Sequence, residues 1–273
     1  MSSKTIEESI IAQQWYNKAM SFMDVKNYKK AIFCFNKVLK IRPRDANVWY
    51  NKGFAFEKIN LTEKALECYD TALEIEPNSI YVLKVKAIAL TDAKRYDEAI
   101  LLFKKILTIE PKNDQIWYYQ GLALLKIEMY EKAIHSFNQG LDIKPQNSML
   151  WYKLGIAYSE LGDNQRALKY FDKGLEIEPN IKYLLRVKGN LLIKIGDYEE
   201  AIKCFSKILN LKPNDFEALI SLSTVCEFKK KYDEFLSYLD KTLELKPNNK
   251  VIREIRENIR IMQKKQMKKG KMI

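Results

Sequence analysis

The sequence predicts an all-α protein built from seven consecutive helix-turn-helix units, and two observations support this. Nine glycines and seven prolines in 273 residues fall below the usual shares of about 7% and 5%, which favours long helices with few turns. The prolines are also spaced 34 residues apart without exception: Pro43, Pro77, Pro111, Pro145, Pro179, Pro213 and Pro247. Regular spacing over the whole chain indicates an internal repeat.

Aligning the sequence on these prolines defines the units and the ends of the chain. The expected repeats are 12–45, 46–79, 80–113, 114–147, 148–181, 182–215 and 216–249. Residues 1–11 are expected to lead into the first helix. Residues 250–273 are expected to form a capping helix and a basic tail.

The second helix of each unit is predicted by three columns, a column being the residues at one position of successive units. A small residue is followed four positions later by an aromatic residue and four later again by leucine, as in Ala31, Phe35 and Leu39. This spacing places the three side chains on one helical face, where the small residue allows close approach of a neighbouring helix. The helix is expected to end just before the proline.

The first helix of each unit is predicted by a second stripe, such as Trp49, Gly53 and Phe56. Glycine inside a helix costs about 0.5–1 kcal/mol relative to alanine, so its recurrence in this stripe predicts helices that cross at short distance. The residues expected to cap these first helices are Asp45, Ser79, Asp114, Ser148 and Asp215. The turns within units carry Asn27, Asp163 and Asp197, and Gly162 and Gly196 precede the last two.

The pattern Trp-x-x-x-Gly, then Ala-x-x-x-Phe, then Pro, at a 34-residue period, resembles the tetratricopeptide repeat over residues 12–249. The resemblance implies a right-handed α-solenoid of seven units. The seventh unit departs from the pattern at Ser223, Cys226 and Phe235, as expected of the last unit of a stack.

A longer period of 102 residues is also visible. The tryptophan column has leucine at Leu83 and Leu185, and the segments that begin with them, 83–86 and 185–188, are Leu-Lys-Val-Lys and Leu-Arg-Val-Lys. This suggests duplication of a block of three units; convergent packing is the alternative.

The resemblance also implies a concave surface lined by the first helices, where a partner peptide or helix would bind. The groove candidates are Tyr16, Met20, Tyr50, Phe54, Lys84, Ile88, Tyr118, Leu122, Tyr152, Ile156, Arg186 and Asn190. Two interpretations remain open. These side chains either form the floor of a binding groove or simply contact the next first helix of the stack.

Some relatives use this surface to clamp the C-terminal carboxylate of a peptide with five basic and asparagine residues. No register of this sequence supplies more than two of the five, so that ligand class is rejected. Lys84 and Arg186 are expected either to pair with isolated acidic groups of a partner or to be solvated charges.

The net charge of +12 is concentrated at the C-terminus, where residues 250–273 hold nine Lys or Arg against Glu254 and Glu257. Val251, Ile252, Ile255, Ile259 and Met262 have helical spacing, so the capping helix should cover the last repeat and fray beyond Met262. The tail residues Lys264, Lys265, Lys268 and Lys269 could attract nucleic acid or anionic membrane, but the absence of interleaved aromatics favours a solubilising role.

The sequence has no Gly-rich phosphate loop, nucleophile elbow, paired histidines or zinc spacing, so we expect no catalytic residue, metal or cofactor. The four cysteines are expected to be apolar fillers. There is no apolar run of eighteen residues and no secretory signal, which predicts a cytoplasmic protein without an integral membrane segment. We therefore expect a non-catalytic interaction scaffold binding a protein or peptide. The alternatives are binding of nucleic acid or an acidic partner through the tail, and self-association.

Overall fold

The computed structural model describes the backbone of residues 3–229, 232–245 and 247–270, without the side chains of 3–5, 223, 226–229, 234, 238, 242, 245 and 266–270. Within these ranges every regular element is an α-helix and no β-strand is present, which confirms the all-α prediction. The helices group into two compact units, Met1–Ile143 and Lys144–Ile273, which we describe separately. From here on, 'unit' means one of these two parts, and a single helical pair is called a repeat.

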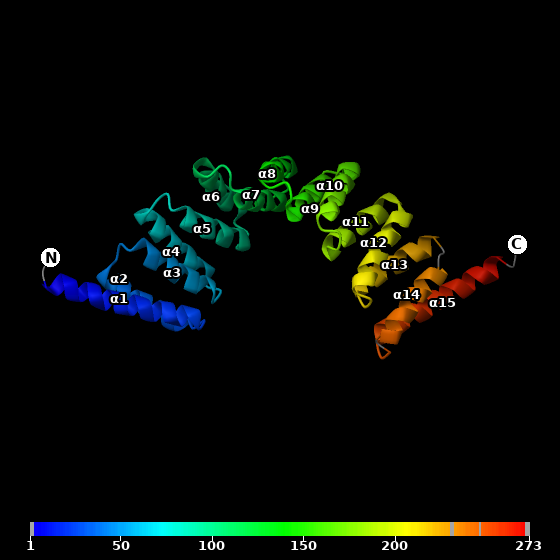
Figure 1. The fold of residues 1–273 in the computed structure, drawn as a ribbon, viewed down its shortest axis with the longest axis horizontal. Coiled ribbons are helices and arrows are strands. Elements are labelled where there is room, and N and C mark those ends of the chain that lie inside the picture. The colour runs from blue at the N-terminus through cyan, green and yellow to red at the C-terminus, as the bar shows by residue number, and fades with distance from the viewer. Residues whose placement is uncertain (1–2, 230–231, 246, 271–273) are drawn as a thin grey trace. The chain divides into compact units, whose positions relative to one another are not determined.

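The first unit contains four helical pairs. Its helices are α1 (Ser3–Asp24), α2 (Tyr28–Ile41), α3 (Ala46–Glu57), α4 (Thr62–Ile75), α5 (Ile80–Asp92), α6 (Tyr96–Ile109), α7 (Asp114–Lys126) and α8 (Tyr130–Ile143). Each helix packs antiparallel to the next, and the second helix of a pair also contacts the first helix of the following pair (Figure 1). The short loops leave no other arrangement for consecutive helices.

The second unit repeats this arrangement and ends with one long helix. Its helices are α9 (Ser148–Glu160), α10 (Asn164–Ile177), α11 (Lys182–Ile195), α12 (Tyr198–Leu211), α13 (Phe216–Lys229), α14 (Tyr232–Leu245) and α15 (Lys250–Gly270). The last helix packs against α14 and α13.

The core consists of the predicted columns. The small and aromatic columns of the second helices are fully buried at 0% exposure, as in Ala31, Phe35, Phe137 and Phe205. The aromatic rings lie directly against the glycines of the first helices, so that a Cβ atom on Gly189 would be only 2.7 Å from Phe205 Cζ. The glycine column therefore has the packing role that the sequence predicts.

The helix caps correct two sequence predictions. Asp45 accepts a hydrogen bond from Val48 N at 3.2 Å, and Asp215 accepts one from Ala218 N at 3.3 Å. At two of the three remaining helix starts the caps are Asn113 and Asn147, not Asp114 and Ser148. The asparagine one residue earlier has the extended backbone of an N-cap, so its side chain reaches the first free amides. Ser79 occupies the cap position of α5 without a side-chain bond.

The tryptophan and proline columns are linked by a hydrogen bond that the sequence did not predict. The indole N–H of Trp49 donates to the carbonyl of Pro43 at 2.8 Å, and Trp117 and Trp151 donate to Pro111 and Pro145 at 2.9 and 2.8 Å. This bond ties the start of α3, α7 and α9 to the loop before each helix.

The helix α15 acts as the expected cap, since Ile252 and Ile259 are buried in the core of the last repeat. Arg256 forms an ion pair with Asp240 at 2.6 Å, and Gln263 donates to Asp233 at 2.6 Å. The expectation of fraying beyond Met262 is wrong for the backbone, because the helix continues to Gly270.

Candidate partner-binding surface

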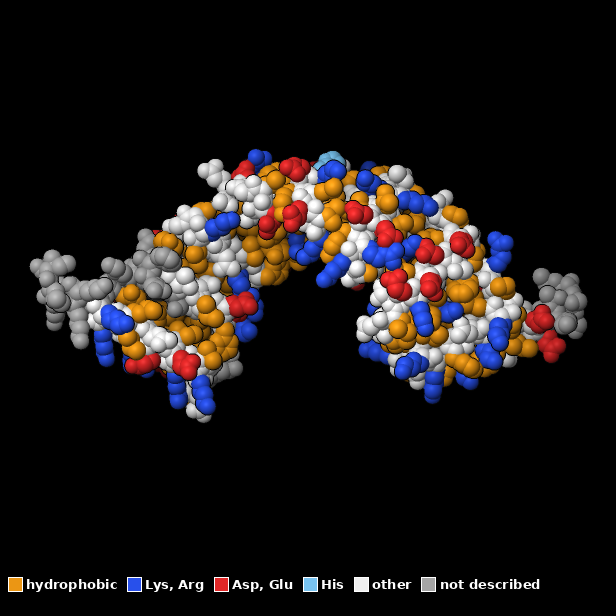
Figure 2. Space-filling view, turned by 180° about the vertical axis from the view of Figure 1, so that it is seen from behind, with side chains coloured by type: hydrophobic (Ala, Val, Ile, Leu, Met, Phe, Trp, Pro, Cys, Tyr) orange, Lys and Arg blue, Asp and Glu red, His pale blue; other side chains and the backbone are white. Residues whose placement is uncertain are grey.

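We call the side of each unit formed by its first helices the first-helix surface. In the first unit this surface comprises α1, α3, α5 and α7. In the second unit it comprises α9, α11 and α13. Neighbouring first helices contact one another directly, for example α5 with α7 and α11 with α13. Figure 2 shows hydrophobic, basic and acidic side chains interspersed on the visible face of each unit.

The tyrosine column contributes mainly to contacts between helices. Tyr50 is only 8% exposed, and its hydroxyl donates to the hydroxyl oxygen of Tyr81 on α5 at 2.6 Å. Burial, and secondarily this bond, raise the pKa of Tyr50 well above its usual range. Phe54 stacks on Tyr50 with ring centroids 6.4 Å apart. For Tyr50, the structure thus favours the framework interpretation over an accessible groove residue.

The apolar column retains accessible surface. Each of its five members has intermediate exposure: Met20, Phe54, Ile88 and Leu122 in the first unit and Ile156 in the second. Tyr16, Tyr118 and Tyr152 have the same intermediate exposure, whereas Asn190 is exposed. Tyr16, Met20, Tyr152 and Ile156 also pack against the buried core clusters of their repeats, so only part of each of these side chains is accessible.

The second unit contains the same tyrosine contact 102 residues later. The rings of Tyr152 and Tyr183 lie 4.9 Å apart, as those of Tyr50 and Tyr81 lie 4.5 Å apart. Here the hydroxyl of Tyr183 donates instead to Met149 Sδ at 3.8 Å. The geometry therefore follows the 102-residue period, but the hydrogen-bond partners differ.

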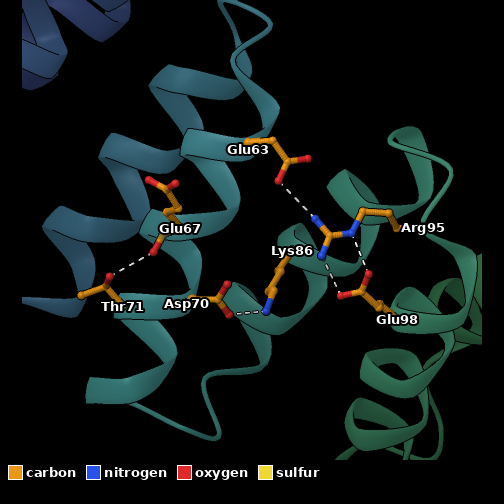
Figure 3. Close-up of polar contacts among 7 residues, drawn as sticks. All are labelled: Glu63, Glu67, Asp70, Thr71, Lys86, Arg95 and Glu98. Atoms are coloured by element: carbon orange, nitrogen blue, oxygen red, sulfur yellow. Dashed lines mark hydrogen bonds and ion pairs between the residues drawn. The ribbon is translucent and has the colours of Figure 1, made fainter.

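An ion pair between helices follows the same period. Lys86 on α5 binds Asp70 on α4 (Figure 3), and Lys188 on α11 binds Asp172 on α10 at 2.5 Å. In both pairs the lysine side chain is largely buried and the aspartate is exposed. The pairs thus hold a first helix to the preceding second helix in both units.

A further network on the first unit surrounds Arg95. Its guanidinium binds Glu98 at 2.6 Å and Glu63 at 3.2 Å, and joins α4 to α6 (Figure 3). The hydrogen bond from Arg95 lowers the pKa of Glu98. These groups are exposed, so the network contributes little to stability.

The two basic candidates of the groove have different surroundings. Lys84 Nζ donates to Gln115 Oε1 at 2.7 Å. Arg186 instead binds two carboxylates, Asp215 at 3.3 Å and Glu217. Sequence reasoning singled out both cations and expected Asp215 as a helix cap, but it predicted neither the contact with Gln115 nor those with the carboxylates.

A hollow of about 520 Å³ lies between α6, α7 and α8 on the first unit. Ile100, Leu101, Leu124 and Ile127 line it together with a hydrogen-bonded pair, Ser136 and Gln120 at 3.0 Å. In the following repeat, the position of Ser136 is taken by Tyr170, whose ring stacks on Trp151 and Tyr158. The smaller serine thus leaves room that the tyrosine occupies elsewhere.

Family models of the tetratricopeptide repeat match residues 12–45, 46–79, 114–147, 148–181 and 184–215, which is more than half of the chain. The chain belongs to the tetratricopeptide repeat family. None of the curated proteins matches it by sequence.

Solved structures of tetratricopeptide repeat proteins resemble this chain in fold. A protein from Parabacteroides merdae ATCC 43184 is 16% identical with a TM-score of 0.69, covering 91% of this chain and 98% of its own. MamA from Desulfovibrio magneticus RS-1 is 21% identical with a TM-score of 0.59, covering 62% and 95%. YrrB, described as having an unusual peptide-binding site, is 22% identical with a TM-score of 0.56, covering 68% and 96%.

Several chemical features of this tetratricopeptide repeat chain bear on other functions. No group of three His, Cys, Asp or Glu residues suited to a metal ion occurs among the described residues. Cys34, Cys68 and Cys204 are buried, free thiols, and desolvation raises the pKa of Cys68 and Cys204 to about 11; the side chain of Cys226 lies outside the description. Within the described ranges, no helix is both long and apolar enough to cross a membrane.

The basic tail of this repeat protein is described only in part. Lys264 and Lys265 are exposed on α15. Lys268 and Lys269 belong to the same helix, but their side chains lie outside the description.

Proposed function

We propose that this protein is a non-catalytic interaction scaffold that binds a peptide or helix of a protein partner on its first-helix surface. The observation that carries this proposal is the apolar column of Met20, Phe54, Ile88 and Leu122, which keeps accessible area on α1, α3, α5 and α7. Apolar residues in a row along neighbouring helices suit an amphipathic helix or an extended segment.

Two further observations support the proposal. The family builds extended binding surfaces from stacked repeats, and YrrB, which resembles this chain in fold, is a relative with a peptide-binding site. We also propose a cytoplasmic location, which the unpaired thiols of Cys34, Cys68 and Cys204 support.

The test compares two charge substitutions on the proposed surface with one elsewhere. Phe54→Asp and Leu122→Asp place a charge on the first-helix surface, whereas Phe33→Asp makes the same change on α2, where Phe33 is 55% exposed. Partners captured by the full chain from native lysate, and washed at high salt, should be lost with the first two variants and kept with the third. Circular dichroism checks that all three remain helical, and retention of every partner by Phe54→Asp and Leu122→Asp would refute the proposal.

A second candidate function, binding of nucleic acid or an acidic partner, is favoured by the exposed cations Lys264 and Lys265. Because Ile252 and Ile259 are core residues, removal of α15 would damage the last repeat. The better variant is therefore Lys264→Glu with Lys265→Glu in the full chain. Binding through the tail should be lost in this variant and weaken steeply with salt, since it depends on phosphate neutralisation.

A further inference from the structure

The two units contain the same group of four positions, 102 residues apart, on neighbouring first helices. In the first unit they are Tyr81 and Lys84 on α5 with Asn113 and Gln115 at the start of α7. In the second unit they are Tyr183 and Arg186 on α11 with Asp215 and Glu217 at the start of α13. The aromatic residue and the cation are kept, but both carboxylates of the second unit are amides in the first.

Because of this exchange of acid for amide, Arg186 has carboxylate partners and Lys84 has an amide partner. Arg186 is neutralised by Glu217 and by Asp215, which is itself only 7% exposed. Lys84 has Gln115 as its hydrogen-bond partner, and no ion pair of Lys84 occurs in the described part of the chain. The ammonium group of Lys84 therefore has no carboxylate partner among the described residues, whereas the guanidinium of Arg186 has two.

The hydrogen bond to Lys84 also fixes the orientation of the Gln115 amide. A lysine ammonium can only donate, so the oxygen of Gln115 must face it. The NH2 group of Gln115 then points away from Lys84 and is available to an acceptor. In the second unit the equivalent Glu217 is a carboxylate and offers no such donor.

Tyr81 belongs to a separate contact. Its hydroxyl lies 2.6 Å from that of Tyr50 on α3, whereas Lys84 on the same helix reaches Gln115 on α7. The equivalent Tyr183 of the second unit donates to Met149 on α9 at 3.8 Å. In both units the tyrosine therefore contacts the preceding first helix and the cation contacts the following one.

We propose that Lys84 and Gln115 form a binding site for the side-chain carboxylate of an acidic residue within the partner segment. The site takes an anion because it presents one cation without an ion pair and one neutral donor, and charge-assisted bonds to a carboxylate are the strongest that such groups make. Ile88, one turn after Lys84 on the same helix, provides the apolar surface for the neighbouring side chains of the segment. The equivalent group in the second unit is closed, because Asp215 and Glu217 already supply the carboxylates.

This inference rests on the proposed function, since it specifies what the first-helix surface recognises. A free C-terminal carboxylate is a different ligand. Relatives that clamp a C-terminus use several cations and asparagines around it, whereas this site has one cation.

The test uses nuclear magnetic resonance on the full chain with three synthetic peptides. The first has blocked ends and a central Glu between leucines, the second has Gln in place of that Glu, and the third is the Gln peptide with a free C-terminal carboxylate. The Glu peptide should bind about tenfold more tightly than the Gln peptide, and shift the signals of α5 and of the Gln115 side-chain amide but not those of α11. Raising the salt concentration should remove most of this preference.

Two variants with the same change in charge locate the effect. Gln115→Glu installs the carboxylate of the second unit beside Lys84 and should lower the affinity for the Glu peptide to that for the Gln peptide. Gln165→Glu makes the same substitution at an exposed position of α10 and should leave the preference unchanged.

The results that would overturn the inference are specific. Equal binding of the Glu and Gln peptides, tighter binding of the peptide with a free C-terminus, equal shifts on α11, or no effect of Gln115→Glu would each refute an acid-specific site at Lys84. Absence of shifts on α5 with every peptide would refute it as well. The proposed function is judged separately by Phe54→Asp and Leu122→Asp, which leave Lys84 and Gln115 intact.

Discussion

Replacing Gly53 by alanine is expected to destabilise the protein, although alanine is the better helix former. A Cβ atom at this position would lie 2.6 Å from Tyr69 Cε1, 2.8 Å from Tyr69 Cδ1 and 3.1 Å from the carbonyl oxygen of Ala65. The ring cannot easily move, because Tyr69 is fully buried and its hydroxyl donates to Glu57 at 3.0 Å. One of the two helices must therefore shift.

The size of the effect follows from two opposing contributions. Overpacking of a close-packed core costs about 1–3 kcal/mol, whereas alanine gains about 1 kcal/mol over glycine in a helix. Because both the ring and the backbone oxygen oppose the new methyl group, we expect a net loss of roughly 1–2 kcal/mol. Urea denaturation followed by circular dichroism should show a lower midpoint.

A second variant shows whether the ring is the cause. In a Tyr69→Leu background the opposing ring is absent, so the additional cost of Gly53→Ala should largely disappear, as in a double-mutant cycle between contacting residues. A control on the same column is Ala87→Gly in the third repeat, where the alanine is already accommodated and its loss should cost about 1 kcal/mol. If Gly53→Ala raises the urea midpoint, the close approach of α3 and α4 does not constrain this position.

Three other outcomes are expected. Trp49→Phe removes the donor to the Pro43 carbonyl and should cost about 1 kcal/mol; an unchanged urea midpoint would show that this bond does not stabilise the loop. Ile259→Ala removes a buried side chain that is 1% exposed and should cost about 2–5 kcal/mol, whereas no measurable change would mean that α15 does not cap the last repeat. The pKa of the Cys68 and Cys204 thiols is raised to about 11 by burial, above an unfolded value of about 8.5, so their contribution to stability is complete below pH 8.5 and is lost as the pH rises toward 11. A thiol reagent at pH 8 should therefore react with them only on unfolding, and rapid reaction with the native protein would contradict this.

The sequence by itself determined the helical class, the number of repeats and most of the core. The proline spacing of 34 residues is a local pattern, as are the small, aromatic and leucine columns. Each repeat packs mainly on its neighbours. Residues such as Ala31, Phe35 and Gly53 could therefore be assigned to buried faces without knowledge of distant contacts. The capping role of α15 followed from the spacing of Ile252 and Ile259 for the same reason.

The helix caps and the end of α15 depended on details of the backbone. Asn113 and Asn147 cap their helices because each lies one residue before the predicted position and has extended dihedral angles. A shift of one residue cannot be read from composition, since Asp114 and Ser148 are equally good capping types.

Only the tertiary structure decided what surrounds each candidate of the binding surface. Tyr50 and Phe54 are four residues apart on one helix, yet Tyr50 is buried and bonds to Tyr81 on the next first helix, while Phe54 keeps accessible area. Lys84 and Arg186 occupy equivalent positions, and their difference in charge compensation arises from residues about thirty positions away, Gln115 and Glu217. The physical reason is that hydrogen bonding and ion pairing across stacked helices depend on distance in space, which the repeat pattern places only approximately.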